Sequence, residues 1–165
     1  MALEPKIYLQ RITFVDGKET IGEKVDVFEK WDNIKYKSAT GLQDYGEQRV
    51  YVEEFPESSK ASVVVSGTRK QTDITLTLLF FSSEDTDNET EAYSSADKTY
   101  HEFMYLISGD KFVYSDNLRN RKAVVYLNGK PDIKNDSLYG IVYKEVAFKF
   151  KNVYGHTFAE DEDIK

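Results

Sequence analysis

The segment Thr72-Asp73-Ile74-Thr75-Leu76-Thr77-Leu78-Leu79-Phe80-Phe81 decides the fold of this chain. Apolar and polar side chains alternate along it, with one set at Ile74, Leu76, Leu78 and Phe80 and the other at Asp73, Thr75 and Thr77. Successive side chains of a strand point to opposite faces, so this pattern predicts a half-buried strand with one wet face. A sheet with one solvated face is typical of antiparallel architecture.

One helix is predicted after this strand, beyond an acidic loop at residues 82–91. Ser94 is the expected N-cap, with Asp97 in the position that Glu or Gln takes in a capping box. Apolar residues then recur at helical spacing, at Tyr100, Phe103, Met104 and Ile107. Gly109 supplies a left-handed stop, so we expect a helix at about residues 95–108 with its apolar stripe against a sheet.

A β-hairpin is predicted near the N-terminus. Its first strand covers residues 6–15, its turn is Asp16-Gly17, and its second strand returns near residues 21–28. The apolar residues of the first strand change face after Leu9. This slip predicts a bulge at Gln10-Arg11, or a strand that changes sheets.

Further strands are predicted at residues 33–39, 49–55, 61–65, 112–114, 123–127 and 139–150. The strand at 61–65 is expected to pair with 72–81 about a turn at Ser66-Gly67. Residues 40–60, which are rich in charge and include Pro56, are predicted to form an arm or long hairpin. Asn128-Gly129 marks a turn, and the polar run that follows it is expected to be a longer connection.

These elements predict an α+β fold that is mainly β. We expect two packed antiparallel sheets, as a sandwich or a partly open barrel, with one flanking helix. A chain of 165 residues fits one domain with a sizeable core, here residues 1–158. Residues 159–165 are expected to be an acidic, flexible tail.

Nothing in the sequence points to catalysis. The absence of cysteine excludes disulfides, thiol catalysis and thiolate zinc sites. His101 and His156 are far apart, and the adjacent Glu53 and Glu54 are expected on opposite faces of a strand. The acidic loop from residue 85 lacks the glycine and the final glutamate of a calcium site, and no glycine-rich phosphate loop precedes the helix. We expect no enzymatic activity, no cofactor and no metal.

The formal charge of −7 repels DNA phosphates, so we expect no specific nucleic-acid binding. The N-terminus lacks the basic and apolar regions of a signal peptide. No apolar stretch approaches the ~20 residues needed to cross a bilayer. We therefore expect synthesis in the cytoplasm of the producing cell and no membrane association.

Charged residues gather in separate patches. Two predicted turns are basic, and they contain Arg69, Lys70, Arg119, Arg121 and Lys122. Acidic residues gather in the loop that holds Glu84, Asp85 and Asp87, and again at residues 160–163. Because a ring built head to tail needs two complementary patches on each subunit, these residues are a candidate subunit interface. The alternative is that the charged loops are only solvated.

The order of elements between Ser66 and Gly155 resembles a known family. The chain reads Ser-Gly-Thr-Arg-Lys at 66–70 and Ile-Thr-Leu-Thr-Leu-Leu-Phe at 74–80, followed by Tyr100-His-Glu-Phe103, Leu106-Ile-Ser-Gly109, Lys111-Phe-Val-Tyr-Ser-Asp116, Arg119-Asn-Arg-Lys-Ala-Val-Val-Tyr126 and Lys144-Glu-Val-Ala-Phe-Lys-Phe150. This order resembles the phage tail-tube fold and the related N-terminal domain of distal tail proteins. In those proteins two packed sheets carry one helix on the flank.

The resemblance implies a structural subunit in the tail of a long-tailed phage or prophage, located in the virion. It implies a homo-oligomer, a hexameric ring that contacts other tail proteins, with an acidic channel through which DNA passes. The stretch at 40–60 would be the hairpin with which tube proteins reach a neighbouring ring. Distal tail and baseplate proteins often carry a second domain after this one. This sequence ends soon after its last predicted strand, so we expect a tube, tube-initiator or completion protein in preference to a distal tail protein.

A second hypothesis comes from the tyrosines, which are more numerous than a core of this size needs. Tyrosines at strand edges and in loops suit protein interfaces or stacking on sugar rings. The alternative function is therefore a monomeric carbohydrate-binding or adhesin-like β-sandwich. Cross-strand packing with the hydroxyl at the surface would explain many of the same residues.

Overall fold

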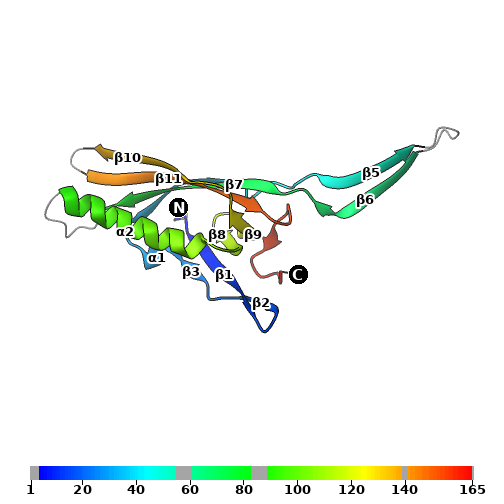
Figure 1. The fold of residues 1–165 in the computed structure, drawn as a ribbon, viewed down its shortest axis with the longest axis horizontal. Coiled ribbons are helices and arrows are strands. Elements are labelled where there is room, and N and C mark those ends of the chain that lie inside the picture. Colours follow the sequence, from blue (N-terminus) through cyan, green and yellow to red (C-terminus); the bar gives the residue numbers. More distant parts are fainter. Residues whose placement is uncertain (1–3, 55–60, 83–88, 139–140, 165) are drawn as a thin grey trace.

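The computed structural model describes residues 4–54, 61–82, 89–138 and 141–164. Within these ranges the fold is mainly β, with a ten-stranded antiparallel sheet, a separate two-stranded ribbon and one long helix (Figure 1). The predicted class, a β-dominated α+β fold with one flanking helix, is confirmed.

The described residues contain these elements: β1 Ile7–Val15, β2 Lys18–Ile21, β3 Val25–Asp26, α1 Val27–Lys30, β4 Ile34–Thr40, β5 Gln48–Glu54, β6 Ala61–Arg69, β7 Thr72–Phe81, α2 Glu89–Ile107, β8 Phe112–Asp116, β9 Arg121–Leu127, β10 Asp132–Leu138, β11 Ile141–Asn152 and β12 Phe158–Ala159. The longest path through the sheet runs β2-β1-β8-β9-β11-β7-β4. The remaining strands β3, β12 and β10 pair with β1, β9 and β11 respectively.

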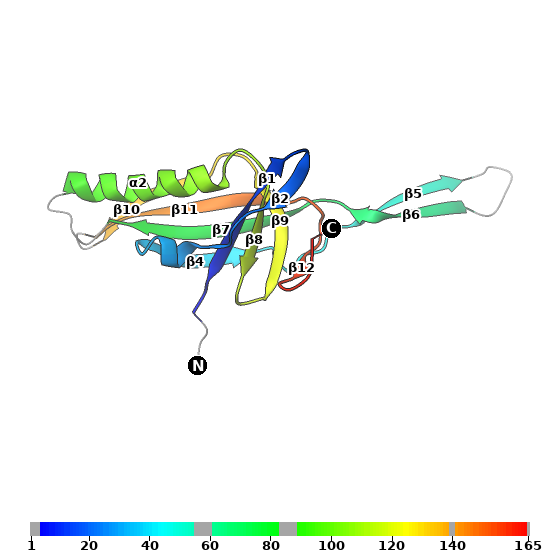
Figure 2. The same cartoon turned by 90° about the horizontal axis from the view of Figure 1, so that it is seen from below.

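The sheet bends where β9 meets β11. Along one edge of β11, β10 pairs with residues 141–147 and β9 pairs with residues 150–152. Strands β10, β11, β7 and β4 form one half, which we name the four-strand panel; β2, β1, β8 and β9 form the other half and cross it steeply in Figure 2. Phe112 and Tyr114 meet Phe150 of the panel at ring-centroid distances of 5.3 and 5.8 Å. The two packed sheets are thus two halves of one bent sheet, and it is not closed as a barrel.

The predicted alternation of apolar and polar residues is present in β7, and its apolar face forms part of the core. Its buried face consists of Ile74, Leu76, Leu78 and Phe80, each with no exposed surface. Helix α2 covers this face, with the Phe103 ring 5.9 Å from Phe80 and 4.9 Å from Phe148 of β11. Full burial of one such side chain contributes about 1.5–3 kcal/mol, so the contact between α2 and the panel is a main source of stability.

Lys144 is the polar exception on the buried face of β11. Its ammonium pairs with Asp97 of α2 and lies 4.8 Å from the centre of the Tyr100 ring. Its aliphatic stem can lie along the core while the charged end is satisfied at the margin. The lysine therefore links the panel to the helix.

The helix ends where the sequence predicts and begins nearly two turns earlier. Gly109 has a φ of +102°, which confirms the left-handed stop. The expected N-cap at Ser94 is wrong, because α2 begins at Glu89 and Ser94 lies inside it. Ala92 and Ala96 are buried and extend the apolar stripe toward the N-terminus, which keeps this part of the segment helical.

The N-terminal hairpin turns at Asp16-Gly17, as predicted, with φ values of 53° and 78°. Its second strand is β2, so the expected strand at 21–28 is wrong. Asp26 instead caps α1 by accepting hydrogen bonds from the backbone N–H groups of Phe28 and Glu29.

The slip of apolar residues in β1 reflects two cores rather than a bulge. The register of β1 with β8 is continuous from residue 7 to residue 11. Ile12 turns away from the main core and packs with Val113 and Val124 in a second, smaller cluster. Val153, Tyr154 and Ile164 cover this cluster, so β8 is buried on both faces.

The two-stranded ribbon of β5 and β6 projects from the body and is named the arm (Figures 1 and 2). Its strands pair only with each other among the described residues. The predicted turn at Ser66-Gly67 is wrong, because both residues lie inside β6 and β7 pairs with β4 and β11. The arm covers residues 48–69, whereas the sequence placed it at 40–60. Part of that stretch, residues 55–60, lies outside the described ranges.

Two further segments differ from the sequence expectation. The polar run after Asn128-Gly129 contains β10, an outer strand held by its pairing with β11. The acidic segment that we expected to be a flexible tail begins in β12, and Glu160 pairs with Lys24. Ile164 packs on the second cluster. This segment covers the outer face of β8 and β9.

Candidate functional site

The arm leaves the body through a joint that is tightly packed against the loop after β11. The joint consists of Gly46 and Glu47 before β5, Lys70 after β6, and Gly155. The backbone N–H of Gly46 donates to the Gly155 carbonyl at 2.7 Å, and that of Lys70 donates to the Glu47 carbonyl at 2.8 Å. Three chain segments are therefore fastened to one another where the arm begins.

Two glycines make this packing possible. A Cβ on Gly46 would lie 1.8 Å from the backbone oxygen of Lys70, and a Cβ on Gly155 would lie 2.2 Å from the same atom. Gly155 also has a φ of +69°, which disfavours a side chain. The joint therefore admits only glycine at these positions, and it holds the arm in a defined direction.

Arg69 and Lys70, two of the candidate interface residues, lie at this joint. The Arg69 guanidinium donates to the Gly46 carbonyl at 3.0 Å and lies 5.5 Å from the centre of the Tyr45 ring. Lys70 pairs with Glu47 at 3.1 Å, and both side chains are exposed. Arg69 thus supports the joint, whereas Lys70 faces solvent.

The other basic candidates divide between two roles. Arg121 donates two hydrogen bonds to Thr157, and Lys122 donates to the Glu160 carbonyl, so both hold the chain's own C-terminal segment. Arg119 is exposed in the turn between β8 and β9. Three of the five basic side chains are thus engaged within their own chain, which leaves those of Lys70 and Arg119 exposed. The acidic candidates Glu84, Asp85 and Asp87 lie outside the described ranges.

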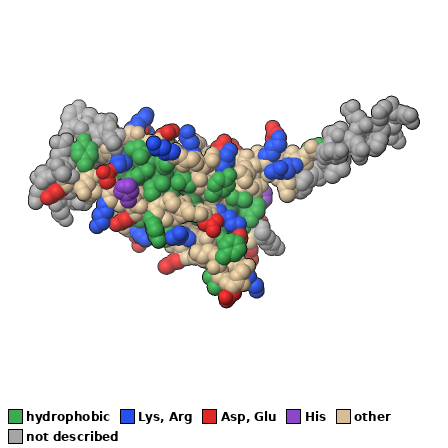
Figure 3. Space-filling view, in the orientation of Figure 1, with side chains coloured by type: hydrophobic (Ala, Val, Ile, Leu, Met, Phe, Trp, Pro, Cys, Tyr) green, Lys and Arg blue, Asp and Glu red, His purple; other side chains and the backbone are tan. Residues whose placement is uncertain are grey.

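A groove of about 790 Å³, which was not predicted from the sequence, lies beside the C-terminal half of α2. Arg11 of β1, Lys30 of α1, and Lys98 and Glu102 of α2 are its charged residues. Three cations and one carboxylate give it a net charge of +2, on a chain of −7. In Figure 3 hydrophobic side chains gather around α2, with basic ones at their border. We name this site the aromatic-basic groove.

Two aromatic residues shape the aromatic-basic groove. Tyr105 is 76% exposed, and the Arg11 guanidinium lies 5.6 Å from the centre of its ring. Trp31 is nearly buried; its indole N–H donates to the Glu102 carboxylate at 2.9 Å, and the Lys30 ammonium lies 5.2 Å from its ring. The signal in the sequence was an aromatic residue on the solvent side of the predicted helix. The rest of the groove comes from distant segments and has no local pattern.

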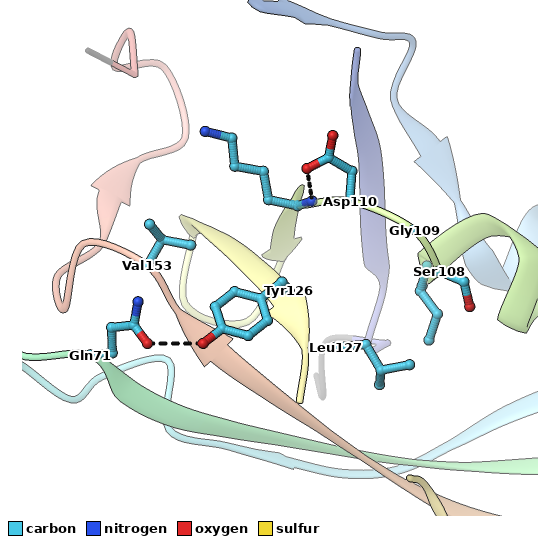
Figure 4. A pocket seen from close by; sticks show the side chains of 9 residues that line it. Gln71, Ser108, Gly109, Asp110, Tyr126, Leu127 and Val153 are labelled. Atoms are coloured by element: carbon cyan, nitrogen blue, oxygen red, sulfur yellow. Dashed lines mark hydrogen bonds between the residues drawn. The ribbon is translucent and has the colours of Figure 1, made fainter. Parts of the chain in front are cut away.

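A second hollow, of about 590 Å³, opens at the C-terminal end of α2 (Figure 4). Figure 4 shows the Tyr126 hydroxyl directed at the Gln71 side-chain oxygen, at a distance of 3.0 Å. The Asp110 carboxylate accepts from the backbone N–H of Lys111. These polar groups bond with one another, and the lining residues include no nucleophile paired with a base.

Ionisable groups with a shifted pKa lie apart from both hollows or in simple ion pairs. Burial raises the pKa of the Asp116 carboxyl, against the hydrogen bond that it accepts from the Arg119 backbone and the charge of that residue. Burial also raises the pKa of the Tyr114 hydroxyl. A hydrogen bond to Glu19 raises the pKa of Lys111. Within the described ranges, no three His, Asp or Glu side chains gather as a metal site.

Neither the known protein-family models nor the curated protein sequences match this chain. Within the described residues, no helix is long and apolar enough to cross a membrane.

Proposed function

We propose that this chain is a structural subunit of a ring or tube in the tail of a phage or prophage. The observation that carries the proposal is the arm. Its strands, of seven and nine residues, project from the body and pair only with each other among the described residues. The family resemblance of residues 66–155 supplies the phage context.

An isolated two-stranded ribbon is marginally stable in water, because it has no second layer on which to bury its side chains. At about 3.3 Å per residue the nine residues of β6 span about 30 Å. Val50, near the base of the arm, is 53% exposed. A ribbon of this length that is held at a rigid joint gains a second layer when it lies on another copy. This favours assembly over a monomeric role.

The four-strand panel supplies a second means of association. Its outer strands β4 and β10 each have one edge without a strand partner in the described residues. The unpaired backbone groups of a free edge can form hydrogen bonds with a strand of another chain. Such an edge is therefore either protected or used for association. In the proposal the panels of neighbouring copies line the inside of the ring.

The face of the panel away from the core carries cross-strand ion pairs. Lys149 pairs with Asp132 at 3.4 Å, Lys151 pairs with Asp73 at 2.7 Å, and Lys37 pairs with Glu145. The net charge of −7 therefore does not gather on this face. Lys134 also pairs with Glu145, at 3.8 Å, so four lysines meet three carboxylates in these pairs. In the proposal the channel wall is therefore nearly neutral, in place of the acidic channel that the resemblance implies, and lysines held by carboxylates have little capacity to grip DNA phosphates.

Assembly of the full-length chain tests the proposal. We expect rings or tubes by electron microscopy as the concentration rises from micromolar to near-millimolar, together with masses well above 19.1 kDa. A variant in which residues 48–69 are replaced by a short Gly-Ser linker should keep the cooperative thermal unfolding of the body and lose these assemblies. A chain that stays monomeric throughout, and that yields no higher species after chemical cross-linking, would contradict the proposal.

The exposed tyrosines do not favour the carbohydrate-binding alternative. Tyr45 lies at the base of the arm, whereas Tyr93 and Tyr105 lie on α2, about 18 Å apart along the helix axis. The contacts of Tyr45 and Tyr105 are with cations, those of Arg69 and Arg11 respectively. Of these three rings, that of Tyr105 lies in a groove, and the cations of that groove favour an acidic occupant over a neutral sugar.

A further inference from the structure

Three cations of the aromatic-basic groove lack a carboxylate partner in the part of the chain that the structure describes. They are Arg11, Lys30 and Lys98, and all three are exposed. Two of them lie against aromatic rings instead, Arg11 against Tyr105 and Lys30 against Trp31. In a chain with 29 acidic residues and a net charge of −7, cations without such partners indicate a site for carboxylates from another chain.

Glu102, the single carboxylate of the groove, leaves the groove with a net positive charge. It lies one helical turn after Lys98 on α2, yet its carboxylate accepts the indole N–H of Trp31 at 2.9 Å. The groove therefore keeps a net charge of +2 beside the exposed ring of Tyr105. A turn of peptide that carries two free carboxylates matches this charge, and its backbone can lie against the ring.

The acidic turn, residues 160–163, supplies such a segment. Its four residues, Glu-Asp-Glu-Asp, are the longest run of acidic residues in the sequence. Glu160 forms an ion pair within its own chain, and Glu162 accepts a hydrogen bond from a nearby backbone N–H group. Asp161 and Asp163 are exposed and have no hydrogen-bond or ion-pair partner within the described ranges. The acidic turn therefore presents two free carboxylates.

The groove and the acidic turn lie on opposite sides of the sheet in one chain. Arg11 and Ile12 are neighbours in β1, so their side chains point to opposite faces. Arg11 reaches the ring of Tyr105 in the groove, whereas Ile12 packs in the second cluster with Ile164, the residue after the acidic turn. In Figures 1 and 2, accordingly, α2 and the C-terminal end lie to either side of β1. The two surfaces can therefore meet only between two copies.

We infer that the aromatic-basic groove of one copy receives the acidic turn of a second copy. This inference rests on the proposed assembly and names one of its contacts. Asp161 and Asp163 lie among the three cations of the groove, and the ring of Tyr105 lies against the backbone of the turn. Because the two surfaces lie on opposite sides of each subunit, the contact repeats head to tail, as a ring or a tube requires.

Disulfide trapping tests the contact directly, because the natural chain has no cysteine. One variant carries Glu162→Cys, which leaves both free carboxylates of the acidic turn in place. A second, tagged variant carries His101→Cys, an exposed residue of the groove, and the matched control carries Leu118→Cys, which is exposed in the turn after β8. The variants are mixed at a concentration at which the chain assembles and are oxidised mildly. We expect about tenfold more mixed disulfide with His101→Cys than with Leu118→Cys.

Charge exchange gives an independent readout. Lys98→Glu alone and Asp161→Lys alone should each raise the concentration for half-maximal assembly by about fivefold, because each places like charges at the contact. A chain that carries both substitutions restores an opposite pair between copies, so that concentration should return toward the natural value. As a control, Glu4→Lys changes the net charge as much as Asp161→Lys does, at an exposed site outside the groove and the acidic turn, and should leave the concentration unchanged.

The outcomes separate the inference from the proposed function. Rings with equal trapping at His101→Cys and Leu118→Cys, or a double variant that assembles no better than either single one, would overturn the inference and leave the proposed function standing. Trapping of the groove by Glu47→Cys, an exposed residue at the base of the arm, but not by Glu162→Cys would assign the groove to the joint and overturn the role of the acidic turn. A chain that stays monomeric and forms no mixed disulfide would overturn both. Cooperative thermal unfolding of each variant establishes that its fold is retained.

Discussion

Replacing Gly46 by alanine should disturb the joint of the arm more than any change at an open glycine. The new Cβ would lie 1.8 Å from the backbone oxygen of Lys70 and 2.9 Å from its carbonyl carbon. An ordinary contact is about 3.4 Å, so the two segments must separate by about 1.5 Å. Because the obstacle is backbone, no side-chain rotation relieves it. The hydrogen bond from Gly46 to Gly155, at 2.7 Å, is lost or stretched by this movement.

The magnitude follows from these two effects. Forced overpacking costs about 1–3 kcal/mol, and the loss of one backbone hydrogen bond costs about 1 kcal/mol. The free energy of unfolding should therefore fall by about 2–4 kcal/mol. For a chain of this size each kcal/mol lowers Tm by about 2–4 °C, so we expect a decrease of about 5–15 °C.

Thermal unfolding followed by circular dichroism measures the effect, with Gly129→Ala as the control. Gly129 has a φ of +80°, and a Cβ there would meet nothing within 4 Å. Its substitution should cost about 1–2 kcal/mol through backbone strain alone. If Gly46→Ala lowers Tm by no more than the control does, the joint is not closely packed. In assembly assays Gly46→Ala should also impair ring formation, because the arm is no longer held in one direction.

Three further changes test the core and the buried polar groups. Phe103→Ala removes the ring that contacts Phe80 and Phe148, and should lower the free energy of unfolding by about 3–5 kcal/mol in urea titration; a loss below about 1 kcal/mol would refute the placement of α2. Tyr114→Phe deletes a buried hydroxyl that bonds to no described residue, and should leave Tm unchanged or higher, whereas a clear decrease would reveal a bond to that hydroxyl. Burial raises the pKa of Asp116, so the folded state binds its proton more tightly and wild-type stability falls as pH rises from the ordinary Asp range through the folded pKa. Asp116→Asn should therefore be more stable than wild type at neutral pH, with the gain vanishing in acid; a variant that is less stable at neutral pH would contradict this assignment.

Local patterns in the sequence were enough to predict several of the elements. The alternation from Ile74 to Phe80 depends on the two-residue period of a strand, and the stripe from Tyr100 to Ile107 depends on helical spacing. Asp16-Gly17 and Gly109 specify backbone conformations that few other residues adopt. Each of these signals involves residues only a few positions apart, so it is readable without knowing the fold.

Pairing between distant segments could not be predicted in the same way. Ser66-Gly67 has turn composition, yet its flanking residues pair with β5 and keep it extended. The strand β10 is polar, and it is a strand because β11 offers it an edge. Backbone hydrogen bonds between strands carry no side-chain signature, so the partner of each strand is decided only when the core forms.

The same distinction between local and distant residues applies to the candidate site. By itself the sequence determined a β-dominated fold with one long helix, because hydrophobic period and turn chemistry are local properties. It indicated an arm but placed it at residues 40–60, whereas the ribbon of β5 and β6 covers residues 48–69. Only the tertiary structure decided that Arg121 and Lys122 hold the C-terminal segment, and that Arg11, Trp31 and Tyr105 share one groove. A surface is built from residues that are distant in sequence, and their proximity depends on how the sheet bends and where the helix packs.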